Sequence, residues 1–115
     1  MSDYQKLHNP IDITALKNYF LGLQERITSA MSALDGKAFI ADEWYKPEDS
    51  KLKGYGRTCI LDGGNILEKG GVGFSHVHGD QMPASASHHR PEVAGRSFEA
   101  LGVSLVFHPH NPKVP

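Results

Sequence analysis

Histidine is concentrated in the last third of the chain: six of the seven histidines lie between Gly70 and Pro115, at positions 76, 78, 88, 89, 108 and 110. In the run GVSLVFH (102–108), the alternation of side chains along a strand would place Ser104 and His108 on one face. At about 3.3 Å per residue they would stand about 13 Å apart, too far for a nucleophile and its base. They could instead line one wall of a large cleft. The alternative is an ordinary sheet face whose polar groups form routine hydrogen bonds.

His76 and His78 also alternate on one face of a predicted strand, in the pattern His-x-His. Neutral imidazoles at this spacing can converge on one metal ion, but a third ligand must come from elsewhere. The residues able to supply it are Asp80, His88, His89, His108 and His110. One hypothesis is therefore a histidine-rich metal-binding protein built on His76, His78 and His108. The other is that these histidines form only ordinary hydrogen bonds.

Arg90 and Arg96 lie in a polar segment together with Glu92 and Glu99. Arginine is the usual partner of a substrate carboxylate because its planar guanidinium bonds both oxygens, whereas a surface arginine can also be merely solvated.

Two other kinds of site are not indicated. The serines lack the context of a nucleophile elbow. The glycine-rich run 70–73 precedes a strand and lacks the Lys-Ser/Thr of a phosphate loop.

A long helix is predicted to begin at Asn9, which would be its N-cap, with Pro10 in the first turn and Asp12 near the positive end of the helix dipole. Apolar residues at alternating steps of three and four form one stripe: Ile13, Leu16, Phe20, Leu23, Ile27, Ala30 and Leu34. Polar residues fall mostly on the other face: Lys17, Gln24, Glu25, Arg26 and Ser32. Gly36 is predicted to end the helix as a left-handed cap. We interpret this helix as a scaffold that covers a sheet.

The remainder of the chain has the composition of short strands and turns. Strands are predicted at 39–45 and 57–61, the second entered through a turn at 54–56, and then at 66–69, 72–78 and 102–108. The run 62–65 (DGGN) is typical of a hairpin, Gly70-Gly71 of a bulge or bend, and 79–96 of a long loop. The predicted class is α+β, an antiparallel sheet covered by helices.

Composition limits the classes of function. The net charge of -1, without a basic block, argues against a nucleic-acid partner. The single cysteine, Cys59, cannot form an internal disulfide and suits a reducing compartment. No apolar stretch approaches the roughly 18 residues of a membrane span, and the N-terminus does not resemble a signal peptide. We therefore expect a soluble, cytoplasmic protein.

Three runs of sequence carry a family resemblance: EKGGVGFSHVHG (68–79), RPEVAGRSFEALGVSLVFHP (90–109) and the closing NPKVP. Together they resemble the oxygen-dependent coproporphyrinogen III oxidases of haem synthesis, which convert two propionates of coproporphyrinogen III to vinyl groups and yield protoporphyrinogen IX. Leu34-Asp35-Gly36 and Asp42-x-Trp44 also match. Three positions depart from the family: Gly73 replaces a usual Asn, His110 a common Arg and Lys113 a common aromatic residue.

The resemblance implies a broad antiparallel sheet between helical layers, with residues 1–8 as a tail and 9–115 as the N-terminal part of a single domain. It implies that Ser104 contacts substrate and that His108 is a divalent-metal ligand, and we add Arg96 as a propionate contact. O2 would be the co-substrate, without an organic cofactor, in a homodimer. The general-acid histidine would lie beyond Pro115, so the 115-residue chain is expected to be inactive. The alternative is a non-catalytic module that binds a tetrapyrrole or a partner protein.

Overall fold

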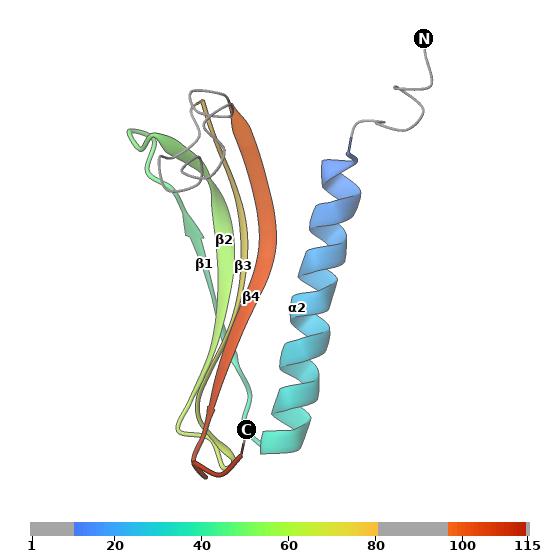
Figure 1. The fold of residues 1–115 in the computed structure, drawn as a ribbon, viewed down its shortest axis with the longest axis vertical. Coiled ribbons are helices and arrows are strands. Elements are labelled where there is room, and N and C mark those ends of the chain that lie inside the picture. Colours follow the sequence, from blue (N-terminus) through green and yellow to red (C-terminus); the bar gives the residue numbers. More distant parts are fainter. Residues whose placement is uncertain (1–10, 81–96, 115) are drawn as a thin grey trace.

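The computed structural model describes residues 11–80 and 97–114. They form one helix, α2 (Ile13–Asp35), followed by four strands: β1 (Ile40–Tyr45), β2 (Leu52–Asp62), β3 (Leu67–Gly79) and β4 (Phe98–Pro109). Each strand pairs antiparallel with its neighbour in the chain, in the order β1-β2-β3-β4 (Figure 1). The predicted α+β class is confirmed.

The helix begins later than the sequence pattern predicted. Asp12, rather than Asn9, is the N-cap, and its Oδ1 accepts a hydrogen bond from the backbone N–H of Ala15 at 3.0 Å. An aspartate in this position satisfies one of the free donors of the first turn and places its negative charge at the positive end of the helix dipole. The prediction that Asn9 caps the helix was therefore wrong, and Asn9 and Pro10 lie outside the described residues.

The other end of the helix is capped as predicted. Gly36 has a φ of 90°, in the left-handed region, and its N–H donates to the carbonyl of Ser32. Glycine adopts this conformation without the steric cost that a Cβ would add.

Within the described residues, 11–80 and 97–114, no helix is long and apolar enough to cross a membrane.

The strands after β1 are longer and more continuous than predicted. β2 begins at Leu52, through the turn predicted at 54–56, and β3 runs without interruption through Gly70-Gly71. Gly70 pairs with a residue on each neighbouring strand, as does Gly71, so ladder hydrogen bonds on both sides hold this segment extended. The irregularity in pairing falls between Leu67 and Lys69 instead.

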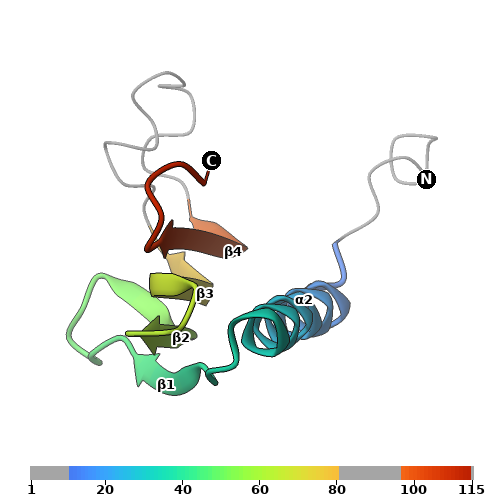
Figure 2. The same ribbon diagram turned by 90° about the horizontal axis from the view of Figure 1, so that it is seen from below.

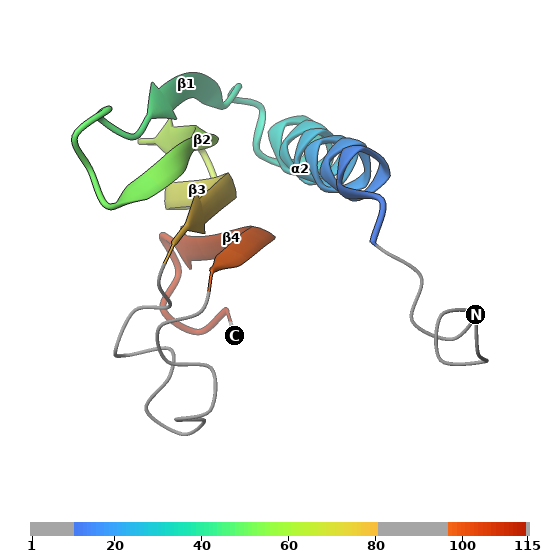
Figure 3. The same ribbon diagram turned by 90° about the horizontal axis from the view of Figure 1, so that it is seen from above.

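The helix packs against one face of the sheet, seen along the strands in Figures 2 and 3. This helix-covered face carries the buried core: Cys59, Leu61, Val72 and Phe74. The Lys17 ammonium lies 4.7 Å from the centre of the Tyr55 ring, which marks the odd-numbered residues of β2 as the side that faces α2. The even-numbered residues of β2 therefore project from the opposite side. We call that side the open face, because no described segment packs on it.

One residue of the helix lies on the face opposite to the one predicted. Gln24, assigned by its polarity to the solvent side, is only 1% exposed, and its Nε2 donates to the carbonyls of Arg57 at 2.7 Å and Val72 at 2.8 Å. The amide reaches the backbone of β2 and β3, which an apolar side chain could not bond. Conversely Leu34, predicted to lie in the buried stripe, is 65% exposed.

The last residue of the helix joins it to the hairpin between β2 and β3. Asp35 is buried, and its carboxylate accepts hydrogen bonds from the backbone N–H groups of Asn65, Ile66 and Leu67 at 2.8 to 2.9 Å. The bond from Leu67, with those from its two neighbours, lowers the pKa of this carboxyl below its usual value of 3.8, against the opposing effect of burial. These bonds fix the helix end relative to the sheet.

Candidate active site on the open face of the sheet

The centre of the open face is a row of three residues on three adjacent strands. Thr58 of β2 lies opposite Gly73 of β3, which in turn lies opposite Ser104 of β4. Two strand spacings of about 4.8 Å place the backbones of Thr58 and Ser104 about 10 Å apart. A shallow depression of about 450 Å³ occupies this region, and its lining residues are Thr58, Gly71, Val72, Gly73, Ser104, Leu105 and Val106.

The glycines make the floor of this depression low. A Cβ at Gly73 would lie 3.6 Å from Ser104 Oγ, and one at Gly71 would lie 3.6 Å from Ile60 Cδ1. Both are ordinary van der Waals distances, so the fold itself would tolerate a methyl group at either position. The effect of glycine at these two positions is therefore to leave open space above the sheet, and not to avoid a steric clash within the fold. A flat ring can approach such a surface closely.

Trp44 forms one border of the open face. Its indole Nε1–H donates to Thr58 Oγ1 at 3.1 Å, and its ring covers Gly56, where any Cβ would overlap the indole. Sequence reasoning did not assign a site role to Trp44 or Thr58. Alternation shows which residues of one strand share a face, but only the register between β1, β2 and β3 brings these two toward Gly73.

His108 projects from the open face, on the same side of β4 as Ser104, as the alternation predicted. It is exposed and lies opposite Lys69 of β3, which in turn lies opposite Asp62 of β2. Among residues 11–80 and 97–114, no group of three His, Cys, Asp or Glu side chains is placed to hold one metal ion. The described residues therefore do not complete a metal site around His108 by themselves, and its role as a divalent-metal ligand stays a prediction.

His76 and His78 lie on the other side of the sheet. His76 is near the Tyr55 ring on the helix-covered face, and its Nε2 is 2.6 Å from Glu99 Oε2. His76 pairs with Leu101, which is seven positions from His108 along β4, or about 23 Å. The metal site hypothesised on His76, His78 and His108 was therefore wrong, because the fold separates His108 from the other two.

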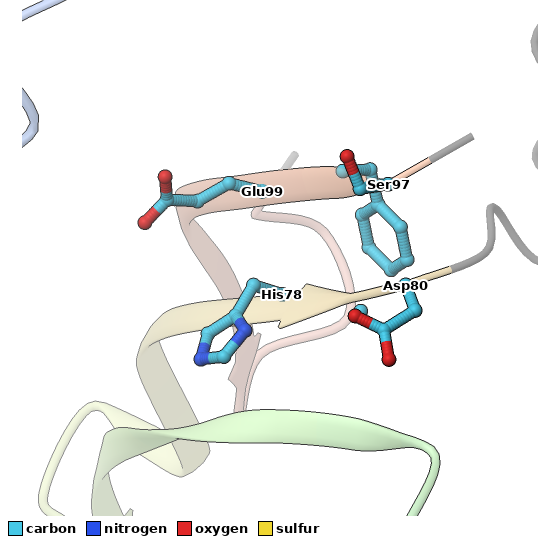
Figure 4. Close-up of a pocket in the computed structure, with 6 residues that line it drawn as sticks. His78, Asp80, Ser97 and Glu99 are labelled. Atoms are coloured by element: carbon cyan, nitrogen blue, oxygen red, sulfur yellow. The ribbon is translucent and has the colours of Figure 1, made fainter.

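A second depression, of about 540 Å³, lies at the end of β3 and β4 (Figure 4). Its lining residues are His78, Gly79, Asp80, Ser97, Phe98 and Glu99. The other predicted candidates of this region, Arg90, Arg96, His88 and His89, lie outside the described residues, so their roles stay predictions.

All four strands, and all of the helix except its first two residues, fall within the match to one protein family. A family model described as coproporphyrinogen III oxidase matches residues 15–115. The match therefore includes Thr58, Gly73, Ser104 and His108, and it agrees with the resemblance carried by residues 68–79 and 90–109. The chain belongs to the coproporphyrinogen III oxidase family, whose function lies in porphyrin biosynthesis.

Proposed function

We propose that the open face is one wall of a site for coproporphyrinogen III, in an enzyme that oxidatively decarboxylates two of its propionates with O2. The observation that carries this proposal is the position of Ser104 beside the glycine floor, within a chain of the coproporphyrinogen III oxidase family. The sheet spans about 14 Å from β1 to β4, which matches the width of a tetrapyrrole ring.

The proposed reaction balances with O2 as the only oxidant. Each propionate loses CO2 and one hydrogen from the carbon attached to the ring, which leaves a vinyl group. The two electrons released reduce one O2, which takes up that hydrogen and one proton from water to become hydrogen peroxide. The electron-rich pyrrole supplies the reactivity toward O2, and no organic cofactor is invoked.

The protein's part in this reaction is to bind and orient the ring. Ser104 can donate a hydrogen bond to a carboxylate, and the imidazole of His108 can donate or accept one at the far end of the same strand face. We assign no step to a metal ion, since the described residues present no set of ligands for one. The contact of Arg96 with a propionate remains a prediction.

Binding of coproporphyrin III, the stable oxidised ring, tests the site directly. The chain contains a single tryptophan, so quenching of Trp44 emission reports the titration. Ser104→Ala should weaken binding by about 10-fold, the value of a hydrogen bond to a charged group. Ser29→Ala, on the exposed side of α2, is the matched control and should bind as wild type. Equal affinities for both variants would contradict the assignment of Ser104.

Oxygen dependence is tested separately from binding. Because the 115-residue chain is itself expected to be inactive, a longer protein that contains these residues is incubated with coproporphyrinogen III under air and under nitrogen, and protoporphyrinogen IX, CO2 and hydrogen peroxide are measured. Product formed only in air, with one peroxide per CO2, supports the proposed chemistry, and product formed under nitrogen contradicts it. Binding without any product in that longer protein would favour the non-catalytic tetrapyrrole-binding module.

A further inference from the structure

We propose that Thr58 is a second hydroxyl contact of the ligand on the open face, oriented by Trp44 to donate its hydrogen bond to a ligand carboxylate. This inference rests on the proposed function, because it concerns the same site. It adds a binding residue on β2 and a positioning residue on β1 to the wall formed by Ser104 of β4.

The hydrogen bond between Trp44 and Thr58 has a defined direction. An indole Nε1–H can only donate, so at 3.1 Å Thr58 Oγ1 must be the acceptor. One lone pair of the hydroxyl is thereby occupied, while its own hydrogen stays available. Among the described residues the structure gives this hydroxyl no acceptor. Trp44 therefore holds Thr58 as a donor that lacks a partner within the described chain.

The position of Thr58 directs that donor toward the ligand. Thr58 and Ser104 lie on either side of Gly73, which has no side chain to fill the space between them, and both line the same depression. A group seated above Gly73 thus has a hydroxyl on each side. Asp42 lies opposite Thr58 on β1, away from Gly73, so its negative charge is on the far side of Thr58 from the depression.

The chemistry of the contact points to a carboxylate. Two hydroxyl groups donate most strongly to a charged acceptor, and the strength of such bonds falls for a neutral carbonyl. The propionate side chains of coproporphyrin III end in carboxylates, so a propionate above Gly73 meets both donors. A pyrrole N–H, which is itself a donor, would leave the hydrogen of Thr58 unused.

Thr58→Val and Thr58→Ser test the contact. Valine preserves the shape of threonine but removes the hydroxyl, and we expect about 10-fold weaker binding of coproporphyrin III, followed by the absorbance of the porphyrin. Serine keeps the hydroxyl and should restore most of the affinity. The loss in Thr58→Val should be smaller for coproporphyrin III tetramethyl ester, whose carbonyls are uncharged. Asp42→Asn changes the residue opposite Thr58 and leaves the Thr58 hydroxyl in place. This variant should bind coproporphyrin III at least as tightly as wild type.

The positioning role of Trp44 is tested in the protein without ligand. The indole N–H resonance of the single tryptophan should move upfield in Thr58→Val and stay near its wild-type position in Thr58→Ser. An unchanged resonance in Thr58→Val would overturn the positioning role. Trp44→Phe retains an aromatic ring over Gly56 but loses the donor, and should weaken coproporphyrin III binding by less than Thr58→Val.

The outcomes separate this inference from the proposed function. If Ser104→Ala weakens binding while Thr58→Val binds as wild type, the site stands and the role of Thr58 is overturned. If wild type does not bind coproporphyrin III, both are overturned. Weak binding by valine and serine variants alike, with intact circular dichroism, would show that packing rather than the hydroxyl matters, and would also overturn the inference.

Discussion

Gln24 provides the sharpest test of how α2 is held against the sheet. Its Nε2 donates to two backbone carbonyls, but its Oε1 is buried without a hydrogen-bond partner among the described residues. Two neutral hydrogen bonds contribute about 2 kcal/mol together, and an unsatisfied buried oxygen costs about 1–3 kcal/mol. These two effects nearly cancel. Gln24→Met, similar in length and without the orphaned oxygen, should therefore change the free energy of unfolding by less than about 1 kcal/mol.

The substitution Gln24→Glu should behave very differently. It replaces the two donors by a carboxylate that faces the carbonyls of Arg57 and Val72. An uncompensated charge in a buried site costs about 3–5 kcal/mol, so this variant should be strongly destabilised at neutral pH. Acidification should lessen the defect, because a protonated carboxyl is neutral and regains one donor.

Urea unfolding followed by far-ultraviolet circular dichroism and by Trp44 emission measures both effects. Glu25→Met, at the exposed neighbouring position, is the matched control and should have little effect. A loss of more than about 2 kcal/mol in Gln24→Met would show that the amide bonds outweigh the orphaned oxygen. A loss below about 1 kcal/mol in Gln24→Glu would show that water reaches the site, and would refute the reasoning.

Two further predictions follow from Asp35 and from the glycines. Because its hydrogen bonds lower the folded-state pKa of Asp35 below 3.8, the stability this carboxylate contributes is complete well above pH 3.8 and is lost as the pH falls through the folded-state value. Asp35→Asn should therefore be less stable than wild type at neutral pH and should show a shallower loss below pH 3.8, measured by urea unfolding across pH; parallel profiles would contradict this. Gly56→Ala should destabilise the sheet by about 1–3 kcal/mol, because its Cβ would overlap Trp44 and the Phe74 carbonyl. Gly102→Ala has no atom within 4 Å of its Cβ and should change stability by less than about 0.5 kcal/mol; equal losses in the two alanine variants would show that the overlap is not the cause.

Local pattern predicted the helix and the strand regions of the chain, although not all of their bounds, and it predicted the faces of single strands. The left-handed cap at Gly36, the strand predicted at 39–45 and observed at 40–45, and the shared face of Ser104 and His108 depend on backbone conformation and on the two-residue period of a strand. The family was also identified from the sequence, through the motifs in 68–79 and 90–109, and the family match confirms it.

Contacts between elements could not be obtained in this way. Gln24 was predicted to face solvent because it is polar. No local sequence signal shows that the backbone carbonyls of Arg57 and Val72 lie within hydrogen-bond distance of its amide. The hypothetical metal site failed for a similar reason, because alternation orders residues within a strand while the pairing of β3 with β4 decides how far His76 lies from His108. The residue at which a helix begins also depends on the surrounding structure, as the N-cap at Asp12 in place of Asn9 shows.

The sequence by itself determined the α+β class, the family, and that Ser104 and His108 share one strand face. Only the tertiary structure decided that Thr58, Gly73 and Ser104 form one row, that Trp44 bonds Thr58, and that α2 covers the opposite side of the sheet. The physical reason is that side-chain direction along a strand is set by the local backbone, whereas register is set by hydrogen bonds between segments distant in the chain.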